Sequence, residues 1–288
     1  MSFKDTFFSQ NHSINCRGRL LDLTRPAVMG VLNITDDSFY DGGKYTNQES
    51  VLKKVSSMVE EGADIIDVGA MSTRPGSKPV PVGSEMEKLS EVLQFIRKDF
   101  PGIPVSIDTC RPEVAKKMII DYEADIINDI TAGGESEEMF RVIAETKTPY
   151  IIMHMQGDPG TMQNNPQYRD VVDEVLLFLA QKTLRLRKLG VTDIIVDPGF
   201  GFGKTLEHNY ELLANLSVFH SLELPILTGL SRKSMISRFL NTDPDNALNG
   251  TTALNMFALG KGSNILRVHD VREAVETRNL YCKLRDSQ

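Results

Sequence analysis

Residues 27–43, AVMGVLNITDDSFYDGG, constrain the fold of this chain more than any other stretch. They open with an apolar run after Pro26 that is too short for a helix, which is typical of a strand buried on both faces. The polar residue Asn33 ends the run, and the turn-forming residues that follow it through Gly43 must lie on the surface. The same order of apolar run, polar tip and loop recurs seven more times along the chain.

Patterns with helical spacing separate these apolar runs. The seven further runs are residues 64–69, 104–108, 125–129, 149–154, 193–197, 225–228 and 264–268. Capping-box spacing at Thr46 and at Ser84 predicts two helix starts, Pro112 suits the first turn of another helix, and Ser231 is expected to begin a later one. Because a strand–helix–strand connection returns the chain in the same direction, eight such units predict eight parallel strands.

We expect these strands to close into a TIM (β/α)8 barrel, a single α/β domain over residues 21–288. Residues 1–20 are expected to form an arm or a hairpin over the barrel floor. A length of 288 residues suits one barrel of this kind. The alternative is an open doubly wound sheet, which is second choice because no G-x-G-x-x-G follows the first run.

Composition excludes several classes of partner and site. The formal net charge of −7 argues against nucleic acid or an anionic membrane as the partner. The apolar runs are shorter than the roughly 18 residues of a membrane span, and the first residues have no signal-peptide layout, so we expect a cytoplasmic protein. Cys16, Cys110 and Cys282 lie far apart with no C-x-x-C spacing, which indicates neither a disulfide framework nor a zinc site.

Polar residues stand at or just beyond most of the predicted strand ends. In a TIM barrel all the carboxyl ends open at one face, and that face carries the site. A single polar residue there is better explained as a cap of the next helix, but so large a set predicts a binding site. The set is Asn33, Ser72, Thr73, Arg74, Asp108, Asn128, His154, Asp197, Lys233, Arg267 and His269.

Two chemical groups are present in this set. Asp108, Asn128 and Asp197 offer carboxylate and amide groups to the edge of a flat, nitrogen-rich heterocycle, whose face Met153 or Phe202 could cover. The second group offers hydrogen-bond donors and positive charge suited to phosphate or carboxylate, and consists of Thr73, Arg74, Ser231, Arg267 and His269. The amide oxygen of Asn33 could bind a Mg²⁺ already held by phosphates.

Eight strings together resemble the dihydropteroate synthase family, in the order expected and over about residues 28–275. They are V-L-N-I-T-D-D-S-F-Y-D-G-G, S-T-R-P-G, S-I-D-T, I-N-D-I, M-H-M-Q-G, D-P-G-F-G-F-G-K-T, S-R-K-S and R-V-H-D-V. The resemblance implies a transferase of folate biosynthesis, which condenses 6-hydroxymethyl-7,8-dihydropterin pyrophosphate with 4-aminobenzoate to 7,8-dihydropteroate and pyrophosphate. It also implies a Mg²⁺ cofactor, a homodimer built from the late helices, and sulfonamides as competitors of aminobenzoate.

The resemblance assigns roles residue by residue. It implies pterin contacts from Asp108, Asn128, Met153, Asp197, Phe202, Lys233 and Arg267. It implies pyrophosphate and aminobenzoate contacts from Asn33, Thr73, Arg74, Pro75, Ser231, Arg267 and His269, with Asn33 also on the metal. The expected catalytic residues are Asp108, Lys233, Arg267 and His269. Asp36 stands where the family commonly has Pro, and Met71 where it commonly has Glu, which bears on the order of the first two loops.

Two features invite other readings. The string G-F-G-F-G-K-T is not a P-loop, because Pro198 stands where that motif requires Gly, and Lys204 is predicted to serve the start of the following helix. His154 is predicted to be a hydrogen-bonding residue rather than a metal ligand.

The rival functions are a pterin-binding methyltransferase that acts on a corrinoid protein, and a catalytically silent barrel that only binds pterins.

Overall fold

The computed structural model describes residues 13–34, 44–70, 80–134, 136–157, 162 and 166–287. Its main sheet has eight parallel strands in the order β8-β7-β6-β5-β4-β3-β10-β9. An additional parallel bridge between Val196 and Ile226 joins β8 to β9 and closes the sheet. The predicted TIM barrel is therefore confirmed, and the open doubly wound sheet is excluded. The strands are β3 Ala27–Asn33, β4 Ile65–Gly69, β5 Val105–Asp108, β6 Ile126–Asp129, β7 Tyr150–Met153, β8 Ile194–Asp197, β9 Leu227–Thr228 and β10 Ile265–Val268.

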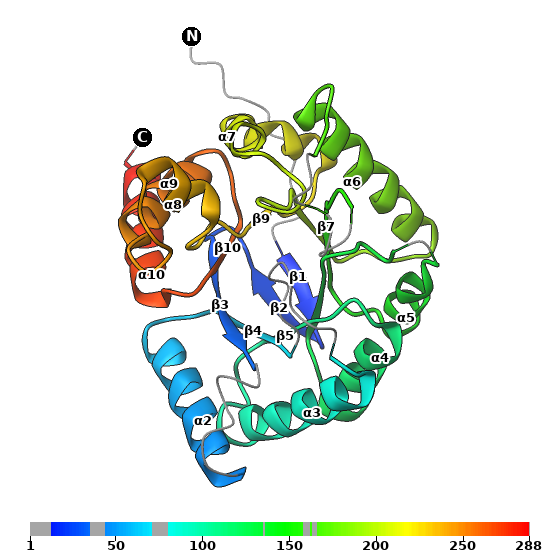
Figure 1. Cartoon of the computed structure of the whole chain (residues 1–288). Coiled ribbons are helices and arrows are strands. Elements are labelled where there is room, and N and C mark those ends of the chain that lie inside the picture. The colour runs from blue at the N-terminus through cyan, green and yellow to red at the C-terminus, as the bar shows by residue number, and fades with distance from the viewer. Residues whose placement is uncertain are drawn as a thin grey trace.

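Helices surround the barrel as an outer ring (Figure 1). They are α2 Lys44–Glu60, α3 Val82–Asp99, α4 Pro112–Tyr122, α5 Glu138–Thr146, α6 Val171–Lys188, α7 Leu206–Ala214, the 3-10 helix η1 Leu216–Leu222, α8 Ser234–Leu240, α9 Leu248–Gly260 and α10 Val271–Arg285. The start of α4 at Pro112 confirms that prediction. Each helix buries one face against the strands, so side chains from two layers form the outer core.

Three predicted helix starts are wrong. Helix α2 begins at Lys44 and α3 at Val82, each two residues before the expected cap. Pro81 precedes α3, and its fixed φ of −57° sets the start in place of a Ser84 side chain. Helix α8 begins at Ser234 rather than Ser231, because Arg232 has a φ of +55° that no helix accommodates. Lys233 is therefore the extended residue in front of the helix.

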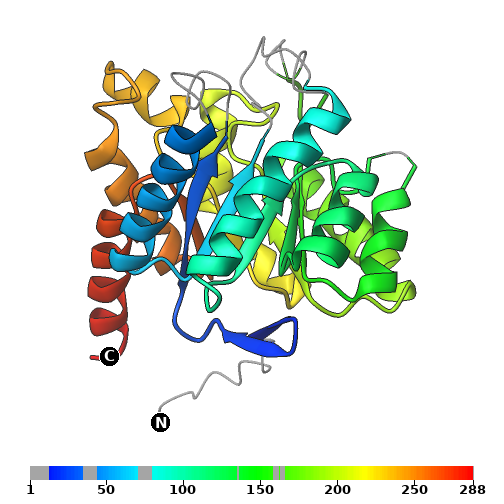
Figure 2. The ribbon, with the colours of Figure 1, turned by 90° about the horizontal axis from the view of Figure 1, so that it is seen from below.

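The strands alternate between two cores. In β4, Ile66 and Val68 face the helices, whereas Ile65 belongs to the interior of the barrel. That interior cluster contains two residues from β3 and one from each of several other strands, and Ile14, Cys16 and Leu23 pack against it. These three come from, or directly follow, the hairpin of β1 Ser13–Cys16 and β2 Arg19–Asp22. The hairpin lies across the end of the barrel opposite the carboxyl ends of the strands (Figure 2).

The apolar cluster fills only the lower part of the barrel interior. Higher in the same strands the inward positions become polar, with Asp67 above Ile65 and Asn128 above Ile126. Burying such groups is costly unless they find partners, so the upper layer must form its own hydrogen-bonded network. Among the described helices, none is long and apolar enough to cross a membrane.

Candidate active site

Arg267 forms the centre of the polar layer. Its Nε donates to Asp67 Oδ2 at 2.7 Å, and its Nη2 donates to Asp108 Oδ2 at 2.8 Å. Asn128 Nδ2 donates to the same Asp67 oxygen at 3.2 Å. Strands β4, β5, β6 and β10 each supply one of these side chains, and the register places Asn128 opposite Asp108. Residues up to 200 positions apart therefore form one buried network at the upper end of the barrel.

Asp67 is the residue of this network that the sequence reasoning missed. It is fully buried, and its second oxygen, Oδ1, has no hydrogen-bond partner among the described residues. The signal was present, because Asp67 is a carboxylate inside an otherwise apolar strand and two positions from Ile65, so both must face the same side. A buried carboxylate requires a cationic or hydrogen-bonding partner. Only the folded barrel identifies that partner as Arg267.

The charged groups of this network change each other's pKa values. Burial raises the pKa of Asp108 to about 7, with the carboxylates of Asp67 and Asp129 adding to the rise and the Arg267 charge opposing it. Burial alone would lower the pKa of Arg267, but Asp67 and Asp108 outweigh it, so the pKa is raised. The guanidinium is thus a permanent cation, whereas Asp108 changes charge near neutral pH.

A second cluster lies at the ends of β8 and β9. Lys233 Nζ donates to the carbonyl oxygen of Phe200 and lies 4.6 Å from the centre of the Phe202 ring. Burial lowers the pKa of Lys233 to about 8, and the charge of Asp197 opposes that shift. Burial raises the pKa of Asp197, whose Oδ1 accepts a hydrogen bond from Gly199 N at 2.7 Å. The cluster places a cation and an aromatic face beside a carboxyl group.

The loops after β9 and β10 meet through Ser231 and His269. Ser231 Oγ accepts a hydrogen bond from His269 N at 3.2 Å and lies 3.1 Å from His269 Nδ1. Arg232, between Ser231 and Lys233, forms a two-pronged ion pair with Asp270 at 2.9 and 2.7 Å. That pair fixes the two loops to each other, and so it holds Ser231 and His269 at the barrel mouth.

Asn33 ends β3 on the exposed side of the mouth, between the ends of β4 and β10. Gly69 adjoins both Asn33 and Asp108, because a Cβ there would lie 3.3 Å from Asp108 Cβ and 3.6 Å from Asn33 Oδ1. The described residues contain no group of three His, Cys, Asp or Glu side chains that could hold a metal. One neutral amide oxygen suits a Mg²⁺ that takes most of its ligands from phosphates and water.

Most of the predicted site residues meet at this mouth. Asn128, Met153, Asp197 and Arg267 are strand residues at the carboxyl ends of their strands, as is Asp108. Phe202, Ser231, Lys233 and His269 follow from the adjoining loops. Thr73, Arg74 and Pro75 lie outside the described residues, and so do the departures at Asp36 and Met71.

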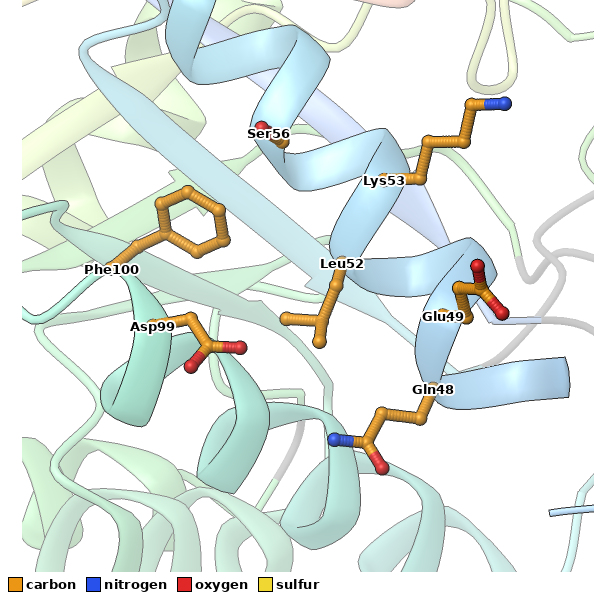
Figure 3. A pocket seen from close by; sticks show the side chains of 7 residues that line it. All are labelled: Gln48, Glu49, Leu52, Lys53, Ser56, Asp99 and Phe100. Carbon is orange, nitrogen blue, oxygen red and sulfur yellow. The ribbon is translucent and has the colours of Figure 1, made fainter. Parts of the chain in front are cut away.

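A groove on the outer surface between α2 and α3 has a different character (Figure 3). Leu52 and Phe100 face each other across it, whereas Lys53 points away. The groove lies on the helical ring and collects none of the polar strand-end residues. It is therefore separate from the mouth of the barrel, where the polar network and the Lys233 cluster converge.

The closed barrel and its polar mouth define the class of protein, which is a TIM-barrel enzyme with its site at the carboxyl ends of the strands. Residues 29–269 match the family model described as pterin binding enzyme. The dihydropteroate synthase of Escherichia coli K12 is 44% identical over 262 residues, covering 90% of this chain and 92% of that protein. The chain belongs to the dihydropteroate synthases, transferases of folate biosynthesis, as the sequence resemblance predicted.

Solved structures agree with this assignment. A Yersinia pestis dihydropteroate synthase in complex with a sulfonamide drug matches with a TM-score of 0.88 and 39% identity, over 95% of this chain and 99% of that one. The Thermus thermophilus enzyme in complex with 4-aminobenzoate matches with a TM-score of 0.84 and 42% identity, over 94% and 99%. The Xanthomonas albilineans enzyme in complex with 7,8-dihydropteroate matches with a TM-score of 0.83 and 31% identity, over 95% and 98%.

Proposed function

We propose that this chain condenses 6-hydroxymethyl-7,8-dihydropterin pyrophosphate with 4-aminobenzoate and releases pyrophosphate, in a reaction that requires Mg²⁺. The observation that carries the proposal is the pairing of two clusters at one mouth, the Asp67–Arg267–Asp108 network and the Lys233–Phe202–Asp197 cluster. Together they offer acceptors, donors and an aromatic face to a flat heterocycle. Complexes of related enzymes with 4-aminobenzoate and with 7,8-dihydropteroate support this choice of substrate and product.

In this proposal the pterin lies between the two clusters. Asp108, Asn128 and Asp197 bind its ring nitrogens and exocyclic amine, and Lys233 binds its carbonyl oxygen. Met153 and Phe202 form the walls of the pocket, and Arg267 stacks against the ring from the barrel side. An ionised Asp108 favours a positively charged ring, which matters because the reacting carbon becomes electron-poor as its bond to pyrophosphate breaks.

The leaving group and the second substrate occupy the outer side of the mouth. Arg267 and His269 bind the pyrophosphate together with Thr73, and Asn33 would hold the Mg²⁺, which when bound neutralises phosphate charge. Ser231, Arg74 and Pro75 complete the aminobenzoate side, whose carboxylate lies near the free N–H groups at the start of α8. The carbon–oxygen bond to pyrophosphate breaks, the aniline nitrogen forms the new bond to that carbon, and the nitrogen then loses a proton. The step requires no nucleophile from the protein.

The proposal includes a homodimer formed through the late helices and a location in the cytoplasm. Several large apolar side chains are exposed on α8, α9 and α10, and they are Phe239, Leu240, Phe257, Leu280 and Leu284. Their number on one side of the molecule, where these helices lie together (Figure 1), supports an interface there. Sedimentation of the purified chain tests the dimer.

The deciding assay is release of pyrophosphate from purified protein. We expect release only when the pterin pyrophosphate, 4-aminobenzoate and Mg²⁺ are all present, and we expect a sulfonamide to compete with 4-aminobenzoate. Binding of the pterin substrate without any release would instead support a silent barrel. Transfer of a methyl group from a reduced folate to a corrinoid protein would support the methyltransferase.

A further inference from the structure

Lys204 is a buried cation that the proposed reaction does not use. It lies directly before α7, whose N-cap is Thr205, and the sequence predicted that it serves the start of that helix. Its side chain does not serve the helix, because the residue is only 3% exposed and is turned into the protein. A buried ammonium needs compensating hydrogen bonds, and the acceptors around this one come from two different strand ends.

Three carbonyl oxygens and a ring nitrogen surround Lys204 Nζ. It donates to the carbonyl oxygens of Gly199 at 2.8 Å, Phe202 at 3.0 Å and His154 at 3.3 Å. It also lies 3.0 Å from His154 Nδ1. Burial and the Lys204 charge lower the pKa of His154 to about 3, so its ring is neutral and Nδ1 can accept a hydrogen bond. Lys204 therefore joins the turn after β8 to the end of β7.

The turn after β8 is packed tightly against that strand end. Gly199 has a φ of +73°, and a Cβ there would lie 1.9 Å from the His154 carbonyl oxygen. Gly203 has a φ of +63°, and its Cβ would lie 2.4 Å from the Gln156 carbonyl oxygen. Glycine at both positions allows the turn to close. Carbonyl groups that point to one spot repel each other, and the Lys204 ammonium supplies the charge that offsets this repulsion.

The same turn carries the wall of the pterin pocket. Phe200 supplies the carbonyl oxygen that Lys233 Nζ contacts, and Phe202 supplies the ring beneath that ammonium. We propose that Lys204 is a positioning residue for pterin binding, which holds residues 198–203 against β7 and thereby fixes Phe202 and Lys233. This inference rests on the proposed function, since it assigns the turn to the pterin side of the site.

We call the contacts of Lys204 Nζ with His154, Gly199 and Phe202 the Lys204 clamp. The charges near Lys204 make the clamp sensitive to pH. Burial, opposed by the Asp197 charge and reinforced by the Lys233 charge, lowers the pKa of Lys204 to about 7. His154, from β7, stays neutral across this range. A neutral amine has only two hydrogens to donate, so the clamp is complete below pH 7 and weakens as the pH rises above it.

The test compares Lys204→Met with wild type. Calorimetry with 6-hydroxymethyl-7,8-dihydropterin pyrophosphate should show a pterin Kd raised by about tenfold or more. The KM for 4-aminobenzoate at saturating pterin should change less than threefold, and amide hydrogen exchange of residues 199–204 should become faster. The matched control is Lys182→Met, which removes another lysine that donates to a loop carbonyl, that of Gly134 at 3.0 Å. Its pterin Kd should stay within twofold of wild type.

A pterin Kd within twofold of wild type in Lys204→Met would overturn the inference, and so would equal losses for both substrates. If that variant does not fold, the wild type provides the second measurement. The protection of its amides at residues 199–204, corrected for intrinsic exchange, should fall as the pH rises through about 7, and unchanged protection would refute the clamp. A wild type that binds no pterin would overturn the proposed function, and the exchange measurement would still decide the clamp.

Discussion

Replacing Asp67 with Asn should impair catalysis while leaving the fold in place. Asn has the same shape as Asp, so its oxygen can still accept from Arg267 Nε and Asn128 Nδ2, but the charge is lost. Two unit charges about 4 Å apart interact by about 4 kcal/mol at an effective dielectric constant of about 20. Arg267 keeps Asp108 as a partner and its side chain is 24% exposed, so only part of this energy is lost.

We expect the transition state to lose about 1.4 to 2.8 kcal/mol of stabilisation, which lowers kcat/KM by about 10- to 100-fold. Without the Asp67 charge, Arg267 keeps the hydrogen bond to the amide oxygen but has Asp108 as its one charged partner in this network, so it shifts towards Asp108, away from the pterin and pyrophosphate. The pH profile gives a second readout. The Asp67 charge helps to raise the pKa of Asp108 to about 7, so its removal lowers that pKa. The acidic limb of kcat/KM should therefore move to lower pH.

Asp64→Asn is the matched control, because Asp64 precedes the same strand and also pairs with an arginine from late in the chain. Its Oδ2 accepts from Arg278 and from Val28 N at the opposite end of the barrel. This variant should lose about 1 to 3 kcal/mol of unfolding free energy in urea, since the buried Arg278 loses its charged partner, and should keep wild-type kcat/KM. Wild-type kcat/KM and an unmoved acidic limb in Asp67→Asn would refute the role given to that network.

Three further substitutions test other parts of the site. Lys233→Ala removes a charge-assisted hydrogen bond and should raise the pterin Kd by about 10- to 100-fold in calorimetry, and an unchanged Kd would exclude Lys233 from the pocket. Gly199→Ala places a Cβ against the His154 carbonyl at a positive φ, and should lower the unfolding free energy by more than about 1 kcal/mol in urea. Tyr150→Phe removes the 2.6 Å hydrogen bond to Asp129 Oδ2 and should lower the unfolding free energy in urea by about 1 to 3 kcal/mol. If either of these two variants is as stable as wild type, the corresponding structural argument is wrong.

Local patterns in the sequence were sufficient for the architecture. Each strand shows as a short apolar run, and most strand ends show as a polar residue at or just beyond the end, because both depend on neighbours within a few positions. The start of α4 at Pro112 followed for the same reason. The starts of α3 and α8 were displaced by two and three residues, because backbone geometry at Pro81 and Arg232 set them instead. The start of α2 was displaced by two residues.

The sequence by itself determined that eight parallel strands would bring their polar tips to one mouth, and that those tips suit a heterocycle with an anionic tail. Only the tertiary structure decided which charges pair there. Asp67 joins Arg267 because β4 and β10 pair with opposite edges of β3, and Lys204 turns inward because the turn after β8 packs on the end of β7. Such contacts depend on the register and closure of the whole sheet, which no short stretch of sequence encodes.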